Sequence, residues 1–160
     1  MPFTDYLGKQ WRVARVADIP FPTSFGGNTT GCPVDDIYKH AYAEKGNNIT
    51  SKEIIAPLMT RRSETRICWH HRLTRSEHLY VAELSCWFVE QEIEPYLDSF
   101  VPIVKREGFS VEAQHAVQEL FGYPLRWSFV KGKALDNGRH RLCALKANKI
   151  PRVAVEFRRA

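Results

Sequence analysis

The last third of the chain carries the pattern that most restricts how the protein can fold. Short stretches with strand-like alternation are separated by glycine-containing turns and by one stretch with the leucine spacing of a helix. In order, the sequence predicts a strand at 126–130, a turn at 131–132, a short strand at 133–135, a helix that contains Leu142, Leu145 and Lys146, and a final strand at 152–157. This mixture predicts an α+β fold in which a small mixed sheet is packed with helices.

Two stretches upstream of this region have the apolar spacing of amphipathic helices. Between residues 90 and 107, apolar side chains recur at intervals of three and four, and a glycine ends the pattern. Ser110 is a typical N-cap for a second helix, which is expected to end at Gly122. A shorter helix is predicted from residue 51 to about residue 63, although it contains Pro57.

The first half of the chain is predicted to contain further strands. Residues 11–16 alternate apolar and polar side chains, which favours a short strand. Residues 66–73 and 78–84 are rich in β-branched and aromatic side chains, so a hairpin is predicted with its turn at residues 74–77. Residues 20–33 are dense in proline, glycine, threonine and asparagine, which predicts a loop.

Composition limits the class of protein further. The chain has 160 residues, of which 44% are apolar and 26% charged, so it can bury one substantial core. It contains no run of about 18 apolar residues and no signal-peptide pattern at its start, so we expect a cytoplasmic protein without a membrane partner. Its four cysteines are scattered, which predicts reduced thiols and no metal site.

The net charge is positive, at +5, and favours acidic partners such as nucleotides or nucleic acids. Basic residues also gather locally, and one such group could follow a nucleic-acid backbone. Its members are Arg61, Arg62, Arg72 and Arg75. The alternative for each of these arginines is an ordinary solvated surface side chain. Trp69, Trp87 and Trp127 would stack on bases if they were exposed beside arginines, whereas core packing is their other role.

The segment from Asp136 to Arg141 is the strongest candidate for a binding site. It lies between a predicted strand and a predicted helix, where the first helical N–H groups have no intrahelical partner and the helix dipole is positive. Asn137 and Gly138 would let an anion approach the backbone, and Arg139, His140 and Arg141 fall in the first helical turn. The alternative is that Asp136 or Asn137 caps the helix and that the arginines pair with acidic neighbours.

This segment resembles a motif of the ParB/sulfiredoxin superfamily. The motif reads Gly138-Arg139-His140-Arg141-Leu142-Cys143-Ala144 here, and the strand Arg152-Val153-Ala154-Val155 follows its helix. The similarity covers about residues 95–157. We therefore expect residues 91–160 to form a ParB/sulfiredoxin-like phosphate-binding region, and residues 1–90 to form an N-terminal extension that packs on the same core.

The resemblance implies that the turn binds the phosphates of a nucleotide. ParB proteins use it for CTP, sulfiredoxins for ATP, and free serine kinases of this fold for ADP, so ATP, ADP or CTP with Mg²⁺ is the expected ligand. The resemblance implies that Gly138, His140 and Arg141 are phosphate ligands. Replacement of Arg141 by alanine is then expected to abolish nucleotide binding without unfolding the protein.

The reaction is predicted from the residues around the turn. Sulfiredoxins have a reactive cysteine where this chain has Arg139, so sulfiredoxin chemistry is not expected, and Cys143 is predicted to be a small core residue. Asp136 could hold Mg²⁺ or act as a base, and His140 could shuttle a proton, which favours phosphotransfer or phosphate hydrolysis. Two alternatives stay open: a DNA- or RNA-binding or ParB-like nuclease module without nucleotide turnover, and an accessory protein that binds another protein.

Overall fold

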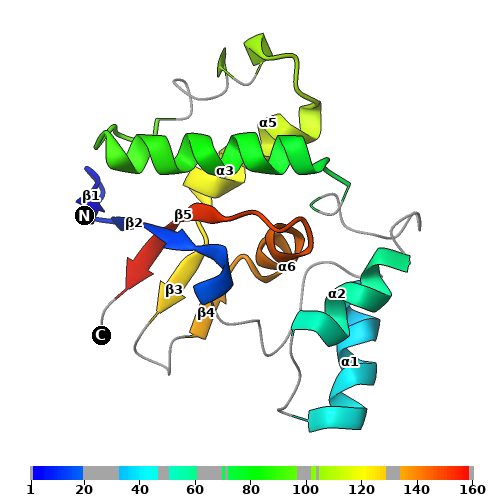
Figure 1. Cartoon of the computed structure of the whole chain (residues 1–160). Helices are drawn as coiled ribbons and strands as arrows, with labels where there is room; N and C mark the ends of the chain where they lie inside the picture. Colours follow the sequence, from blue (N-terminus) through cyan, green and yellow to red (C-terminus); the bar gives the residue numbers. More distant parts are fainter. Residues whose placement is uncertain are drawn as a thin grey trace.

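A mixed five-stranded sheet runs through the middle of the structure (Figure 1). The computed structural model describes residues 2–19, 33–46, 51–60, 70, 72–96, 102–103, 105–128 and 134–158. Across the sheet, the order is β1 (Phe3–Thr4), β2 (Gln10–Arg15), β5 (Arg152–Arg158), β3 (Arg126–Ser128) and β4 (Ala134–Asn137). Neighbouring strands are antiparallel except β3 and β5, which are parallel. The chain therefore has the predicted α+β class.

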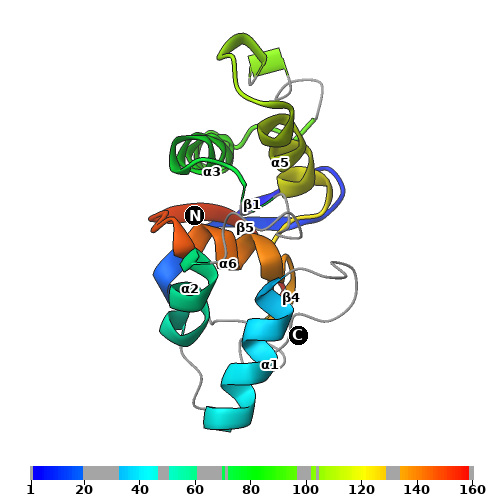
Figure 2. The same ribbon diagram turned by 90° about the vertical axis from the view of Figure 1, so that its right-hand side faces the viewer.

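Helices lie on both faces of this sheet (Figure 2). One face is covered by α3 (Arg75–Glu90) and α5 (Val111–Gly122), and α6 (Arg139–Ala147) lies on the other. Beyond α6 lie α1 (Pro33–Lys45) and α2 (Ser51–Thr60), while the short 3-10 helix η1 (Val16–Asp18) follows β2. No helix in the described ranges is both long enough and apolar enough to cross a membrane.

The core is built from both halves of the sequence. β2 pairs with β5 along five residue pairs, from Trp11 with Glu156 to Arg15 with Arg152. As a result, β1, β2 and α3, which all precede residue 91, belong to the same sheet and core as the C-terminal elements. The largest fully buried side chains are Trp11, Ile19, Ile54, Leu58, Leu73, Leu125, Leu142, Val117 and Val153.

Residues 75–90 form a helix, so the predicted strand at 78–84 is wrong. Thr74 starts the helix with a capping box: its Oγ1 accepts from the Glu77 amide at 3.1 Å, and the Glu77 carboxylate accepts from the Thr74 amide at 3.2 Å. His78, Val81, Ala82, Ser85 and Val89 are buried with helical spacing. The β-branched and aromatic residues of this segment favour a strand locally, and the cap at Thr74 outweighs that preference. Of the partner strand predicted at 66–73, only residues 70, 72 and 73 are described, and none of them is in a strand.

The helix predicted at 90–107 is also wrong in its first part. α3 ends at Glu90, and the chain then turns at Glu92, which has a positive φ of 54°. Residues 93–96 have no regular secondary structure, and of the described residues that follow, 102–103 and 105–106 are helical. The apolar residues do have helical spacing in the sequence, but the backbone turn at Glu92 interrupts the helix.

The remaining predicted elements are found close to their expected bounds. Strands β2, β3, β4 and β5 and helices α2, α5 and α6 confirm the pattern read from the sequence. Pro57 lies inside α2, as expected. The predicted turn at 131–132 and the predicted loop at 20–32 lie outside the described residues, while Pro33 begins α1, a helix that was not predicted.

Candidate functional site

A left-handed glycine connects β4 to α6. β4 ends at Asn137, α6 begins at Arg139, and Gly138 between them has φ 89° and ψ 29°. A Cβ atom at this position would lie 2.2 Å from Leu125 Cδ2 and 3.0 Å from Arg141 Nη2. Glycine is thus needed both for its positive φ and for the close approach of its neighbours. The turn is consequently held against Leu125 and against the guanidinium of Arg141.

The side chain of Arg141 turns inward from this helix start. Its Nη1 donates to the backbone carbonyl of Glu119 at 3.0 Å, and its Nη2 donates to the carbonyl of Tyr123. Both carbonyls lie at the C-terminal end of α5, where the negative end of the helix dipole attracts a cation, and the Glu119 carbonyl also accepts from the Tyr123 amide at 2.8 Å. Only 12% of the side chain is exposed. Because two of its nitrogens donate to α5, Arg141 holds the turn in place from the inner side. A direct contact of Arg141 with phosphate, as expected from the sequence, stays a prediction.

A half-buried charge network accompanies Arg141. One carboxylate oxygen of Glu119, Oε2, lies 2.9 Å from His70 Nε2 and 3.7 Å from Arg141 Nε. Burial raises the pKa of Glu119, but the hydrogen bond from His70 and the nearby positive charges outweigh it, and the net effect is a lowered pKa. Burial lowers the pKa of Arg141 to about 10, which leaves the guanidinium charged at neutral pH.

His70 is the neutral member of this network. Burial is the largest influence on its imidazole and lowers its pKa, although the hydrogen bond to Glu119 acts in the opposite direction. Because an ionised carboxylate can only accept, the neutral ring donates its Nε2–H to Glu119. The ring of His78, on α3, donates to the backbone carbonyl of His70 at 2.8 Å. The network therefore links residue 70 and α3 to α5 and α6.

The outer side of the turn is formed by the first residues of α6. The first turn contains no acidic side chain, while Arg139 and His140 are its first two residues. His140 is half-buried, and its positive charge when protonated lowers the pKa of His70. The backbone of Asp136, Asn137 and Arg139 is described, but their side chains lie outside the described part of the structure. The N-terminus of α6 is thus electropositive, and the Arg141 guanidinium on its inner side adds a positive charge.

Two of the four arginines predicted to form a nucleic-acid surface, Arg72 and Arg75, lie in the described residues, and both are exposed. Arg75 Nε donates to the carbonyl of Asn148 at 3.0 Å and so ties α3 to the C-terminal end of α6. Arg61 and Arg62 lie outside the described residues. A nucleic-acid surface made by these four arginines stays a prediction.

One cavity beside Arg141 is too small for a nucleotide. Its volume is about 30 Å³, and it is lined by Arg141, His70 and His78 together with apolar residues of α3, α5, α6 and β5. That volume holds about two water molecules, since each needs about 10–15 Å³ of such space. A base or sugar would have to lie outside this cavity.

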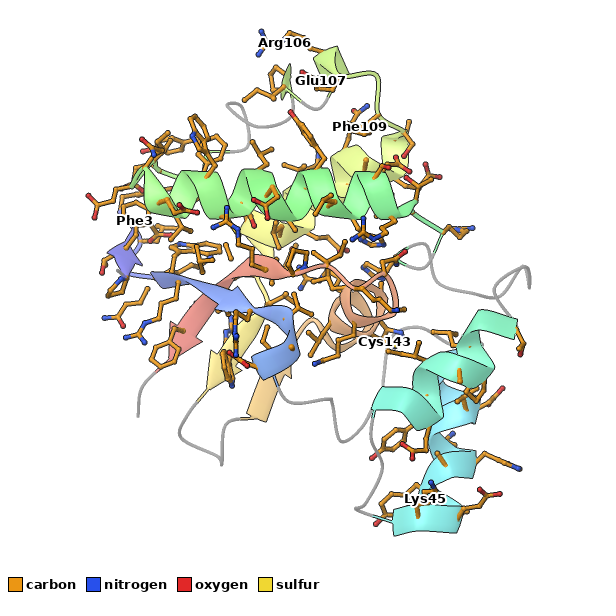
Figure 3. The ribbon with its side chains drawn as sticks, in the orientation of Figure 1. Phe3, Lys45, Arg106, Glu107, Phe109 and Cys143 are labelled. Atoms are coloured by element: carbon orange, nitrogen blue, oxygen red, sulfur yellow. The ribbon has the colours of Figure 1, made fainter. Side chains whose placement is uncertain are left out.

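The cysteines described here are core residues. Cys143 on α6 (Figure 3) is fully buried, as predicted, and so is Cys86 on α3. Burial raises the pKa of the Cys86 thiol to about 12, so that thiol is not a nucleophile at neutral pH. Among the residues that the structure describes, no three His, Cys, Asp or Glu side chains are placed to hold a metal ion.

Two members of the network were missed in the sequence. Glu119 lies 22 residues before Arg141 and His70 lies 49 residues before Glu119, so no local motif joins them. One weak signal was present: Glu119 is an acid in the last turn of a predicted helix, where the dipole disfavours a negative charge unless a cation is near.

The chain matches no protein-family model, no curated protein and no solved structure. Its resemblance to the ParB/sulfiredoxin superfamily therefore remains a proposal that rests on the motif itself.

Proposed function

We propose that the protein binds a nucleoside phosphate at the turn of residues 136–141, with the phosphates at the N-terminus of α6. The observation that carries the proposal is the position of Gly138. Its left-handed backbone is fixed between Leu125 and the Arg141 guanidinium, so the first amides of α6 are held in one orientation above a buried cation. Preorganised amide donors of this kind suit an anionic ligand.

The roles of the side chains follow from this arrangement. The amides of residues 139–141 would bind phosphate oxygens. Arg139 and His140 would complete the contacts from the helix surface. Arg141 would act beneath the turn, through its charge and by holding the turn in place, because its hydrogen bonds go to α5.

The reaction proposed for this site is phosphotransfer or phosphate hydrolysis. ATP, ADP or CTP with Mg²⁺ is the ligand that the motif resemblance favours. Asp136 is the first residue of this turn and would hold Mg²⁺ or accept a proton, while His140 would shuttle one.

A second candidate uses the same turn to bind a backbone phosphate of DNA or RNA. It is favoured by the small cavity, of about 30 Å³, beside Arg141, since a nucleic-acid strand keeps its bases outside this part of the core. The net charge of +5 agrees with a polyanionic partner.

Calorimetric titration with ATP, ADP, CTP and GTP, each with and without Mg²⁺, tests the proposal. We expect one nucleotide to bind, and we expect Arg139→Ala and His140→Ala each to weaken binding by about tenfold, which corresponds to about 1.4 kcal/mol. Lys149→Gln is the matched control, because Lys149 is an exposed cation just past the other end of α6. Unchanged affinity in both turn variants, or an equal loss in Lys149→Gln, would overturn the site.

Two further measurements separate the candidates. If the site is catalytic, Asp136→Asn retains nucleotide affinity and loses turnover. If no nucleotide binds while short DNA or RNA binds with a steep salt dependence, the nucleic-acid candidate replaces the nucleotide one.

A further inference from the structure

A second hollow lies on the sheet, away from the turn. It has a volume of about 320 Å³ and is lined by β2, η1, β3 and β5, with Arg12, Arg15, Asp18, Trp127, Val155 and Phe157 among its walls. We call it the sheet groove. Its size is at the lower end of the range of about 300–1,000 Å³ found for small-ligand sites. None of these residues belongs to the turn at 136–141.

Arg12 is the distinctive residue of the sheet groove. Its guanidinium carbon lies 4.1 Å from the centre of the Phe157 ring, so a cation–π contact fixes the side chain on the groove wall. Its Nε is buried and has no hydrogen-bond partner. A buried donor that lacks an acceptor costs about 1–3 kcal/mol, so a small movement of the side chain that brings Nε to an acceptor oxygen of a ligand would stabilise this position.

Three other arginines of the sheet contrast with Arg12. Arg15 forms two hydrogen bonds with Asp18, both of 2.9 Å. Arg126 lies 3.1 Å from Glu156, and Arg152 lies 2.7 Å from Glu83. Within the described residues, Arg12 has no ion pair of this kind. Its positive charge is therefore available to a partner that enters the sheet groove.

The remaining walls indicate what kind of partner fits. Trp127 is a half-buried aromatic residue on β3, and the buried side chains of Val155 and Phe157 on β5 also line the groove. A simple inorganic anion would use Arg12 but not the aromatic walls, while an apolar ligand would leave the Arg12 donor unsatisfied. A flat ring joined to an anionic group uses both features.

We propose that the sheet groove binds one nucleotide unit, with a phosphate oxygen at Arg12 and the base against the aromatic walls. Arginine and aromatic side chains side by side are the residues on which proteins bind unpaired nucleotides. The unit is either a free mononucleotide or one residue of a single strand. This goes beyond the proposed function, because it requires a second site on different elements.

Fluorescence anisotropy of a labelled short oligothymidylate, titrated with the full chain, tests the inference. Arg12→Gln is expected to weaken binding by about tenfold. Arg106→Gln is the charge-matched control, because Arg106 is exposed and lies beyond α3 from the sheet (Figure 3), and its affinity should stay within about twofold of that of the original chain. Competition by thymidine monophosphate identifies a free nucleotide as the ligand, whereas competition by unlabelled oligomer alone identifies a single strand.

Three results would overturn the sheet groove: no binding of either probe, equal affinity in Arg12→Gln, or an equal loss in Arg106→Gln. If Arg12→Gln does not fold, Arg12→Lys decides, because it keeps a positive charge but lacks the planar donor group and should also bind weakly. His140→Ala separates the two sites. A loss confined to His140→Ala assigns the oligomer to the turn and contradicts the groove, while a loss confined to Arg12→Gln supports the groove even if the turn binds nothing.

Discussion

The guanidinium of Arg141 contacts Glu119 twice, with Nη1 3.0 Å from the backbone carbonyl and Nε 3.7 Å from the carboxylate. One residue of α5 thus supplies both a helix-terminal dipole and a full negative charge to the same buried cation. The start of α6 is fixed to the end of α5 by this pairing. The contact between Arg141 and Glu119 therefore also fixes the position of the turn at Gly138.

Removal of the Arg141 side chain should therefore destabilise the protein. We expect Arg141→Ala to lower the free energy of unfolding by about 3 kcal/mol, since it leaves Glu119 and two helix-end carbonyls without their cation. This changes the expectation from sequence, in which alanine at this position leaves the fold intact. Urea denaturation measures the loss, and exposed Arg72 provides the control, with Arg72→Ala changing stability by less than about 0.5 kcal/mol. Equal stability of the two variants would contradict the role given to Arg141.

Substitutions at two glycines with positive φ distinguish the cost of backbone strain from the cost of steric overlap. Gly138 has φ +89° and would place a Cβ 2.2 Å from Leu125 Cδ2, whereas Gly108 has φ +73° and has nothing within 4 Å. Gly108→Ala should cost about 1–2 kcal/mol for its left-handed backbone alone. Gly138→Ala should cost about 1–3 kcal/mol more because of the overlap. Thermal or urea unfolding gives both values, and equal losses would show that the Leu125 contact does not constrain the turn.

Acid should weaken the fold through the His70–Glu119 pair. Both groups have a lowered pKa in the folded protein, so the unfolded chain takes up protons first and stability falls as the pH falls. The loss from His70 begins below its ordinary pKa of 6.5, and the loss from Glu119 begins below 4.5. His70→Gln should remove the first part of the decline and reduce the second, because the hydrogen bond and charge of His70 help to lower the pKa of Glu119. Urea unfolding at a series of pH values measures this, and the same pH dependence in both proteins would be inconsistent with a buried, neutral His70.

Glu77 is expected to support two helices at once. Its carboxylate accepts from the Thr74 amide at 3.2 Å and from the hydroxyl of Ser110, the N-cap of α5. Thr74→Ala removes one cap and should cost about 1 kcal/mol. Glu77→Ala should cost more, because it disturbs the starts of both α3 and α5. Glu112→Ala, an exposed acid in the first turn of α5, is the control for the helix dipole, and a loss as large as that of Glu77→Ala would argue against the shared role.

Local patterns predicted the C-terminal part of the fold and missed the long-range part. The strict alternation at 152–157 and the glycine before α6 each act within a few residues, so β5 and α6 could be read from sequence. At 78–84 the same residues satisfy a strand pattern and a helix pattern, and the capping box at Thr74 decides for the helix.

The candidate site was predictable in its position but not in its geometry. Gly138 and the basic helix start are visible in the sequence. The inward turn of Arg141 depends on carbonyls at the end of α5, 22 residues away along the chain for Glu119, and no local rule connects them. The sheet groove is harder still to predict from sequence. Its residues Arg12, Trp127 and Phe157 lie on three different strands and are brought together by the strand order of the sheet.

The most direct test of the phosphate site is a ¹⁵N-resolved titration of the backbone amides with the nucleotide that binds in calorimetry. The account predicts that the largest shifts fall on the amides of residues 138–141, and that they persist when Arg12 is replaced by glutamine. Shifts that are absent from these four amides, or that are confined to β2, β3 and β5, would contradict the phosphate site at the start of α6.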